Sequence, residues 1–186
     1  MNKHDHILIS LAPRHAENIF AGRKQIELRR RTMHVTPGTL VWVYVTLPIG
    51  AIVGRAKVTA IHSAAPGMLW QQFGAVSGLT ESEFLGYLDG VAEGMVLVLE
   101  DARYLKLPIS LEAARGIAAG FHPPQFFVRL DDGHPLAATI IDQASRQRDF
   151  HPAYSAAAQS LATSANKITR KHGTSSLLPD SLSIAA

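Results

Sequence analysis

The chain has 186 residues, a length that suits one large domain or one domain with an appendage. Its hydrophobic content of 47% is typical of globular proteins and excludes a chain that is disordered throughout. The sequence has no run of about 18 apolar residues, so we expect no membrane-spanning helix. The net charge of +3 is unevenly placed, because residues 14–57 carry eight basic and two acidic side chains, whereas residues 58–130 carry four basic and seven acidic ones.

The first half of the chain predicts one helix among four strands. Residues 6–12 form an apolar run of strand length that ends at a proline, and residues 14–21 carry apolar side chains at helical spacing before a glycine. Residues 25–31 alternate between apolar and charged side chains, which predicts a second strand. Residues 39–46 are rich in β-branched and aromatic side chains and predict the strongest strand, and residues 51–62 predict the next one, with a glycine that marks a bulge or a close approach.

The second half predicts shorter elements. Residues 68–73 suit one or two helical turns, and residues 80–83 resemble a capping box that begins the next helix. A buried strand is expected over residues 95–99, a short helix over residues 108–115, and a closing strand over residues 125–130. The strands are clustered without a regular βαβ repeat, so we expect an α+β domain around a small, mostly antiparallel barrel.

The character of the chain changes after residue 130. Residues 136–148 suit one amphipathic helix, and the segment from residue 155 onward is rich in Ala, Ser and Thr with few large apolar side chains. Such a composition offers little hydrophobic burial to offset the entropy of ordering. We therefore expect a domain over residues 1–130, followed by an extension over residues 131–186 with one helix and a partly flexible tail.

The most informative spacing is Gly22-x-Lys24-x-x-Glu27-x-Arg29. If Gly22 ends the first helix, Lys24 lies at the corner between helix and strand, and Glu27 and Arg29 share one face of that strand. Such a lysine and carboxylate form either an ion pair that lines a cleft or a surface cluster that contributes little to stability. The spacing alone leaves both interpretations open.

This spacing over residues 22–29 resembles the motif of the ASCH domain, a family with a PUA-like β-barrel. Four further segments resemble the same family in the same order, at residues 8–13, 48–54, 80–84 and 123–125. The resemblance covers roughly residues 6–130. It implies an α+β fold in which a small mixed or antiparallel barrel is flanked by short helices, with a cleft beside the motif.

The family resemblance implies binding of RNA or of a modified nucleoside, and family members are predicted to regulate transcription or translation. One branch resembles amidohydrolases that act on N4-acetylcytidine, and another has ribonuclease activity. In the amidohydrolase branch a lysine, a threonine and a helix glutamate carry catalysis; Lys24 and Glu83 match the first and the last. Glu27 occupies the threonine position and has no hydroxyl to form an acyl intermediate, which argues against that chemistry.

Two classes of site residue follow. If the protein is a hydrolase, the expected catalytic residues are Lys24, Glu27 and Glu83, with Glu27 activating water or Lys24 assisting attack by a 2′-hydroxyl. The expected ligand-binding residues are Lys24, Glu27, Arg29, Arg30, Arg31, Arg14, Arg55 and Tyr44. The arginines suit phosphates but also suit a solvated surface, and Tyr44 shares a strand face with Trp42, where it either stacks on an unpaired base or packs in the core.

We expect no metal and no cofactor, because no spacing of ligands nominates a metal site and no phosphate-binding loop is present. The absence of cysteine excludes a disulfide framework, and a cytoplasmic location is expected. Three functions remain open: an RNA-binding regulator, a ribonuclease or nucleoside hydrolase, and a module that recognises a protein partner through the C-terminal extension.

Overall fold

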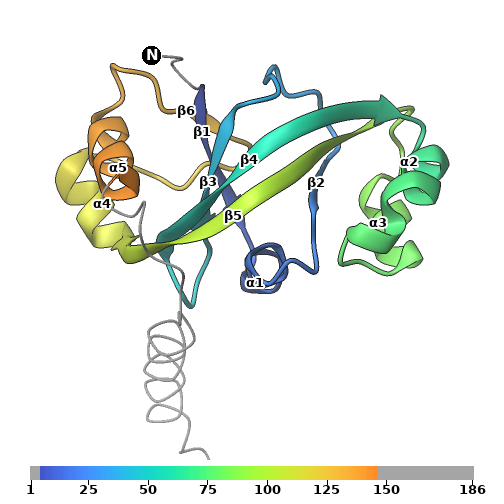
Figure 1. The fold of residues 1–186 in the computed structure, drawn as a ribbon, viewed down its shortest axis with the longest axis horizontal. Helices are drawn as coiled ribbons and strands as arrows, with labels where there is room; N and C mark the ends of the chain where they lie inside the picture. The colour runs from blue at the N-terminus through green and yellow to red at the C-terminus, as the bar shows by residue number, and fades with distance from the viewer. Residues whose placement is uncertain (1–4, 146–186) are drawn as a thin grey trace, which may run out of the picture. The chain divides into compact units, whose positions relative to one another are not determined.

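In the computed structural model, which describes residues 5–145, six strands form one curved mixed sheet, a half-barrel with the order β2-β5-β4-β3-β1-β6 (Figure 1). The strands are β1 (His6–Leu11), β2 (Ile26–Arg29), β3 (Leu40–Val45), β4 (Ala51–Ala64), β5 (Gly94–Ser110) and β6 (Val128–Arg129). The helices are α1 (Pro13–Phe20), α2 (Pro66–Phe73), the 3₁₀ turn η1 (Gly74–Val76), α3 (Glu81–Tyr87), α4 (Leu111–Ile117) and α5 (Pro135–Ser145). Figure 1 shows α2 and α3 at one end of the sheet and α4 and α5 at the other.

The sheet is mixed because β1 and β3 run parallel, whereas the other paired strands are antiparallel. Parallel neighbours need a crossover connection, and α1 together with β2 provides it. The sheet and its short flanking helices confirm the predicted α+β class.

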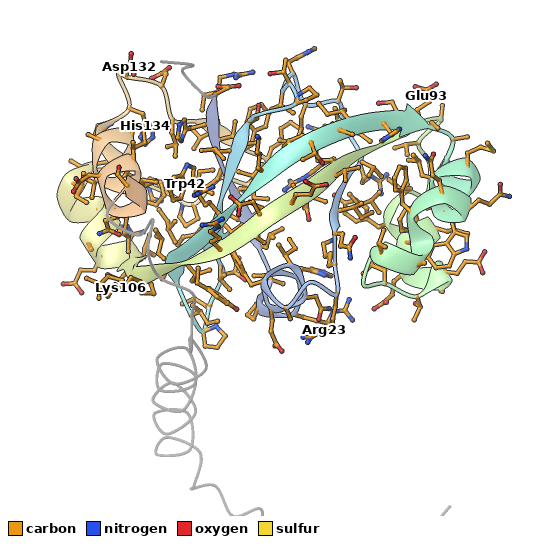
Figure 2. All side chains as sticks on the ribbon, in the orientation of Figure 1. Arg23, Trp42, Glu93, Lys106, Asp132 and His134 are labelled. Carbon is orange, nitrogen blue, oxygen red and sulfur yellow. The ribbon has the colours of Figure 1, made fainter. Side chains whose placement is uncertain are left out.

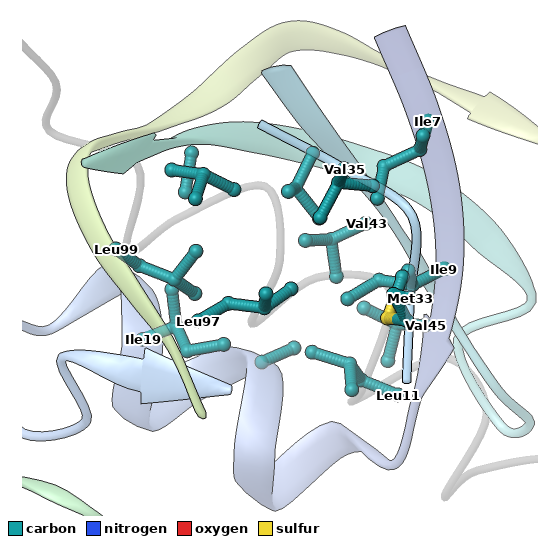
Figure 3. Packing of buried hydrophobic residues seen from close by; sticks show 14 of the residues in the cluster. Ile7, Ile9, Leu11, Ile19, Met33, Val35, Val43, Val45, Leu97 and Leu99 are labelled. Carbon is teal, nitrogen blue, oxygen red and sulfur yellow. The ribbon is translucent and has the colours of Figure 1, made fainter. Parts of the chain in front are cut away.

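The alternation of β3 divides the core. Val41 and Val43 belong to the first hydrophobic cluster, which fills the inside of the half-barrel (Figure 3). Trp42 and Tyr44 point to the opposite face and join a second cluster, which includes Leu136 of α5. Successive side chains of a strand point to opposite faces of the sheet, so this strand contributes to two cores at once.

The predicted alternation of apolar and charged side chains along β2 is confirmed, and it places the charged side chains on one face of the strand. Ile26 and Leu28 belong to a third hydrophobic cluster, together with Phe84 of α3. Glu27 and Arg29 point to the other face, where their cross-strand partners Leu97 and Met95 belong to the first cluster. Both charged side chains therefore lie on the inner face of the half-barrel.

Several predicted local features are confirmed. Thr80 and Glu83 form a complete capping box, in which each side chain accepts a hydrogen bond from the backbone N–H of the other residue. Gly54 is a point of close approach, because a Cβ there would lie 2.4 Å from the carbonyl oxygen of Arg103 and 2.6 Å from the ring of Phe20. A larger side chain at position 54 would force the strands apart.

Three boundaries differ from the prediction. The strand predicted over residues 95–99 extends to Ser110, because β5 stays paired with β4 across the mostly polar residues 100–103 and on to Ser110. The helix predicted from residue 108 begins at Leu111 instead, since Ser110 is its N-cap and accepts a hydrogen bond from the N–H of Ala113. The closing strand, predicted over residues 125–130, is limited to β6, where Val128 and Arg129 pair with Leu8 and Ile7 of β1.

The helix predicted over residues 136–148 is present as α5, which packs Leu136, Ala137 and Ile140 into the second cluster. Its last predicted residues and the predicted flexible tail lie outside the described residues. Among the helices of residues 5–145, none has the length and apolar character needed to cross a membrane.

Candidate functional site

Lys24, Glu27 and Arg29 form a buried group of charges, here called the ion cluster. The Nζ of Lys24 lies 3.5 Å from Oε2 of Glu27, and Nη2 of Arg29 lies 3.0 Å from Oε1 of the same carboxylate. The three residues are only 3%, 5% and 6% exposed. Two cations share one carboxylate, so the ion cluster has a formal charge of +1 away from water.

The local backbone explains why Lys24 is buried at the corner. Gly22 has a φ of +73°, a left-handed conformation that ends α1. The chain then turns back, and the N–H of Lys24 donates to the carbonyl oxygen of Asn18 at 2.9 Å. Gly78 leaves room for this side chain, since a Cβ there would lie 3.2 Å from Cβ of Lys24. The predicted corner position of Lys24 is thus confirmed.

The guanidinium of Arg29 is only partly satisfied. Its Nη1 donates to the carbonyl oxygen of Phe126 at 3.2 Å, and the ring of Phe126 lies 5.9 Å from its central carbon. Its Nε and Nη2 are buried and have no hydrogen-bond partner within residues 5–145. The contact from Nη2 to Glu27 is close enough for an ion pair but is not aligned as a hydrogen bond. Buried donors are rarely left unsatisfied, so this guanidinium is an unusual feature of the protein interior: Nε has no acceptor among the described residues, and Nη2 has only its ion pair with Glu27.

His15 of α1 lies beside the ion cluster. Burial lowers the pKa of its imidazole, and the positive charge of Lys24 lowers it further, while the negative charge of Glu27 opposes this shift. The ring is therefore neutral near pH 7. Its Nδ1 is buried and has no hydrogen-bond partner among the described residues.

Glu83 extends from α3 toward α1, the helix that carries His15. Its Oε1 accepts a hydrogen bond from Nη1 of Arg14 at 2.8 Å, which links α3 to α1. The backbone N–H of Thr80 is the main cause that lowers the pKa of Glu83 to about 2, and the hydrogen bond from Arg14 adds to it. Glu83 is thus an ionised capping residue next to the ion cluster, and it has no direct ion pair with Lys24 among the described residues.

Tyr87 lies one helical turn after Glu83 and is 43% exposed. Desolvation raises the pKa of its hydroxyl, and the charges of Arg29 and Glu27 also act on it. The hydroxyl is therefore within electrostatic reach of Glu27, Arg29 and Arg30, and the residue as a whole is half-exposed. Because residues four apart share a helix face, the position of Glu83 was a sequence signal that could have identified Tyr87 as a site residue.

The basic run at the end of β2 does not form one surface. Arg30 points away from the ion cluster and donates to the carbonyl oxygens of Tyr87 at 3.0 Å and Asp89 at 2.7 Å, where it caps the C-terminus of α3. Arg31 lies beyond the end of β2 and is exposed. Two backbone carbonyls occupy the guanidinium of Arg30, which gives it a structural role, and its expected contact with phosphate stays a prediction.

Arg55 and Tyr44 are separated from the ion cluster by the sheet. Arg55 is paired in register with Trp42, which belongs to the second cluster, and its Nη1 lies 3.5 Å from Asp101. Tyr44 is only 3% exposed in the same second cluster, which leaves no ring face for a base to stack on. Figure 2 shows Trp42 close to α4 and α5, whose side chains cover this face. The structure therefore does not bring Arg55 and Tyr44 together with the ion cluster, and their expected ligand contacts stay predictions.

The structure adds three residues that the sequence analysis did not select for the site, namely His15, Tyr87 and Phe126. Phe126 is 97 residues away from Arg29 in the sequence, and no local pattern connects the two. Among residues 5–145, no group of three His, Asp or Glu side chains could hold a metal ion. The arrangement combines a cationic centre, a buried and only partly satisfied guanidinium, a neutral imidazole and a half-exposed tyrosine.

Comparison with known proteins connects this arrangement to one family. The sequence model of the ASCH domain matches residues 9–112, which include every site residue described above except Phe126. The ASCH domain-containing ribonuclease of Zymomonas mobilis is 32% identical to this chain over 118 residues, which span 63% of this chain and 79% of the ribonuclease.

Solved structures show the same similarity. The crystal structure of ASCH from Zymomonas mobilis aligns with a TM-score of 0.68 and 29% identity, and the alignment covers 73% of this chain and 94% of that one. A serine-to-alanine variant of that protein aligns with a TM-score of 0.69 and 28% identity over 74% and 94% of the two chains. A hypothetical protein from Leishmania major, 14% identical, aligns with a TM-score of 0.51 over 78% of this chain and 98% of its own, which shows a similar fold only.

Proposed function

The chain belongs to the ASCH domain family and has its PUA-like α+β fold, and from this premise we propose that it binds single-stranded RNA at the ion cluster. The observation that carries the proposal is the buried guanidinium of Arg29, which has two unsatisfied donors inside a group of charges with an excess positive charge. We further propose that RNA binding serves the regulation of transcription or translation.

The energetics of the ion cluster support an anionic ligand. Removing a charge from water costs several kcal/mol, which an ion pair offsets only when its geometry and hydrogen bonds are good. Here Glu27 balances one of the two cations, Lys24 and Arg29, and the described part of the chain supplies no second carboxylate for the other. A phosphate oxygen placed on Nε and Nη2 of Arg29 would satisfy both donors, because a guanidinium binds phosphate through two parallel N–H groups.

Single-stranded RNA fits better than a duplex because it offers bases that are free to stack. Tyr87 presents a partly exposed ring near Arg29, and aromatic rings bind unpaired bases with little sequence preference. A single modified nucleoside would use the same ring but would lack the phosphate that Arg29 suits.

The proposal also covers the domain boundaries, the location of the protein and the role of the C-terminal extension. We propose that residues 1–130 form the RNA-binding domain and that residues 131–186 are an extension, of which α5 packs on the domain and the part after α5 is available to a protein partner. A cytoplasmic location suits an RNA ligand. Removal of residues 146–186 tests the role of the extension: RNA affinity should stay unchanged, and association with a protein partner should be lost.

Fluorescence anisotropy with a labelled single-stranded RNA oligonucleotide tests RNA binding. Affinity should fall as salt rises, and Arg29→Gln should weaken binding and reduce the salt dependence by about one phosphate contact. Arg23→Gln is the matched control, because Arg23 is exposed and bound to Glu17 at 3.0 Å (Figure 2). No detectable binding at low salt would reject the proposal.

A second candidate function is ribonuclease activity. The relative from Zymomonas mobilis is named a ribonuclease, and a neutral imidazole beside a lysine offers groups for proton transfer. Threonine-type hydrolysis of an acetylated nucleoside is not favoured, since Glu27 stands at the nucleophile position and is bound by two cations. Incubation of wild type with labelled RNA, followed by gel analysis, tests this candidate.

A further inference from the structure

Two kinds of unsatisfied polar atom lie around the ion cluster. Arg29 contributes two buried donors, Nε and Nη2, and His15 contributes the buried nitrogen Nδ1. When the imidazole is neutral and protonated on Nε2, Nδ1 is a hydrogen-bond acceptor. A ribonucleotide needs this combination, because its phosphate accepts hydrogen bonds and its 2′-hydroxyl donates one.

The turn between α1 and β2 places His15 and Lys24 on the same side of α1. His15 and Asn18 are three residues apart and share a face of α1. The carbonyl oxygen of Asn18 accepts a hydrogen bond from the N–H of Lys24. Asn18 and Lys24 both lie next to Gly78. His15 therefore lies on the side of α1 that faces Lys24, and not on the solvent side.

Resting on the ribonuclease activity proposed above, we propose that His15 is the proton acceptor that activates the 2′-hydroxyl of bound RNA. The 2′-oxygen attacks the adjacent phosphorus, and its proton passes to Nδ1 of His15. The new bond joins the 2′-oxygen to phosphorus, while the bond from phosphorus to the 5′-oxygen breaks with its electron pair. The leaving 5′-oxygen takes a proton from water, so the products are a 2′,3′-cyclic phosphate and a 5′-hydroxyl.

The surroundings of His15 suit this step. Lys24 and Arg14 lower the pKa of the imidazole, Glu27 and Glu83 raise it, and burial has the largest effect and lowers it. The net result is a ring that is neutral near pH 7 and free to accept a proton. Lys24 and Arg29 lie where the phosphate gains negative charge in the transition state, which favours attack.

The experiment measures single-turnover cleavage and RNA affinity in the full chain. His15→Gln keeps a polar side chain of similar size but cannot accept and carry the proton, so cleavage should slow by about 100-fold or more while affinity stays within about twofold. The wild-type rate should rise with pH through a midpoint below 6.5, and this rise should be absent in His15→Gln. His62→Gln is the matched control, since the ring of His62 packs on Phe73 at 4.9 Å.

Three further readouts separate the loss of a proton acceptor from misfolding and test the role of the 2′-hydroxyl. RNA affinity reports whether each variant is folded, and added imidazole should restore part of the cleavage rate to His15→Ala. An RNA with a 2′-deoxy sugar at the cleavage site should bind but resist cleavage, because it lacks the attacking hydroxyl.

The possible failures are distinguishable. If wild type binds RNA but leaves it intact, the ribonuclease candidate falls, and the role of His15 falls with it, while RNA binding stands. If wild type cleaves RNA and His15→Gln cleaves at the wild-type rate with the same pH profile, only the role of His15 is rejected. Products with a 5′-phosphate would reject the 2′-hydroxyl mechanism.

Discussion

The carboxylate of Glu27 lies 3.0 Å from the guanidinium of Arg29, two residues further along β2, and both side chains are buried on the inner face of the half-barrel. Residues two apart on a strand point to the same face, so the strand itself brings this pair together. Lys24 then approaches the same carboxylate from the corner after α1. Glu27 is the only anion that the described residues place in contact with these two buried cations.

Removal of that anion should destabilise the protein. Glu27→Gln leaves two buried cations without a counterion, and breaking a buried ion pair in this way costs about 3–5 kcal/mol. The free energy of unfolding from urea titration measures the effect. Glu17→Gln is the control, because Glu17 forms an exposed pair with Arg23, and exposed pairs contribute about 0–1 kcal/mol. Equal stability losses in the two variants would contradict the burial argument.

Tyr87→Ala should weaken binding of single-stranded RNA without changing its salt dependence. Loss of a base-stacking ring costs about 1–3 kcal/mol, which corresponds to roughly a 5- to 150-fold loss of affinity. Tyr87→Phe should retain most of the affinity, since the ring remains. Leu107→Ala controls for the loss of exposed apolar surface, because Leu107 is 70% exposed and lies on β5. Wild-type affinity in Tyr87→Ala would remove this residue from the RNA site.

Arg30 and Arg29 should behave differently although they are adjacent. Arg30→Ala removes the two hydrogen bonds to the carbonyls at the end of α3, so the free energy of unfolding should fall by about 1 kcal/mol. RNA affinity should stay close to wild type, because the guanidinium of Arg30 is held by the carbonyl oxygens of Tyr87 and Asp89 and has no contact with Glu27 among the described residues. Denaturation and anisotropy on the same preparation test both statements, and a large loss of affinity would restore Arg30 to the binding surface.

Stability should decrease in acid partly through Glu83. Its pKa in the folded protein is lowered to about 2 from the ordinary value of 4.5, so folding favours the ionised carboxylate. Its contribution is present above the unfolded pKa and is lost as the pH falls from about 4.5 toward 2. The melting temperature of wild type should therefore fall more steeply over this range than that of Glu83→Gln. Parallel curves for the two proteins would show that Glu83 does not couple folding to pH.

The motif was readable from sequence because its geometry is local. The alternation of β2 places Ile26 and Leu28 on one face and Glu27 and Arg29 on the other, and Gly22 ends α1 just before Lys24. Likewise, the capping box of α3 depends only on Thr80 and a glutamate three residues later. Each feature follows from backbone geometry over a few residues.

Other parts of the candidate site depend on contacts between distant segments. The sequence indicated that Tyr44 and Trp42 share a strand face, but only the packing of α4 and α5 shows that this face is buried. Arg55 is likewise placed on the far side of the sheet by its pairing with β3. Periodicity indicates which residues share a face, and it does not indicate which face another element will cover.

The sequence by itself determined the family, the α+β class and the adjacency of Lys24, Glu27 and Arg29, since these follow from motif spacing and from strand and helix periods. Only the tertiary structure decided that this group is buried with an excess positive charge, and that Phe126, from a segment far along the chain, binds Arg29. The physical reason is that burial and unsatisfied hydrogen bonds belong to the whole packed molecule. No window of sequence contains the atoms that remove a side chain from water.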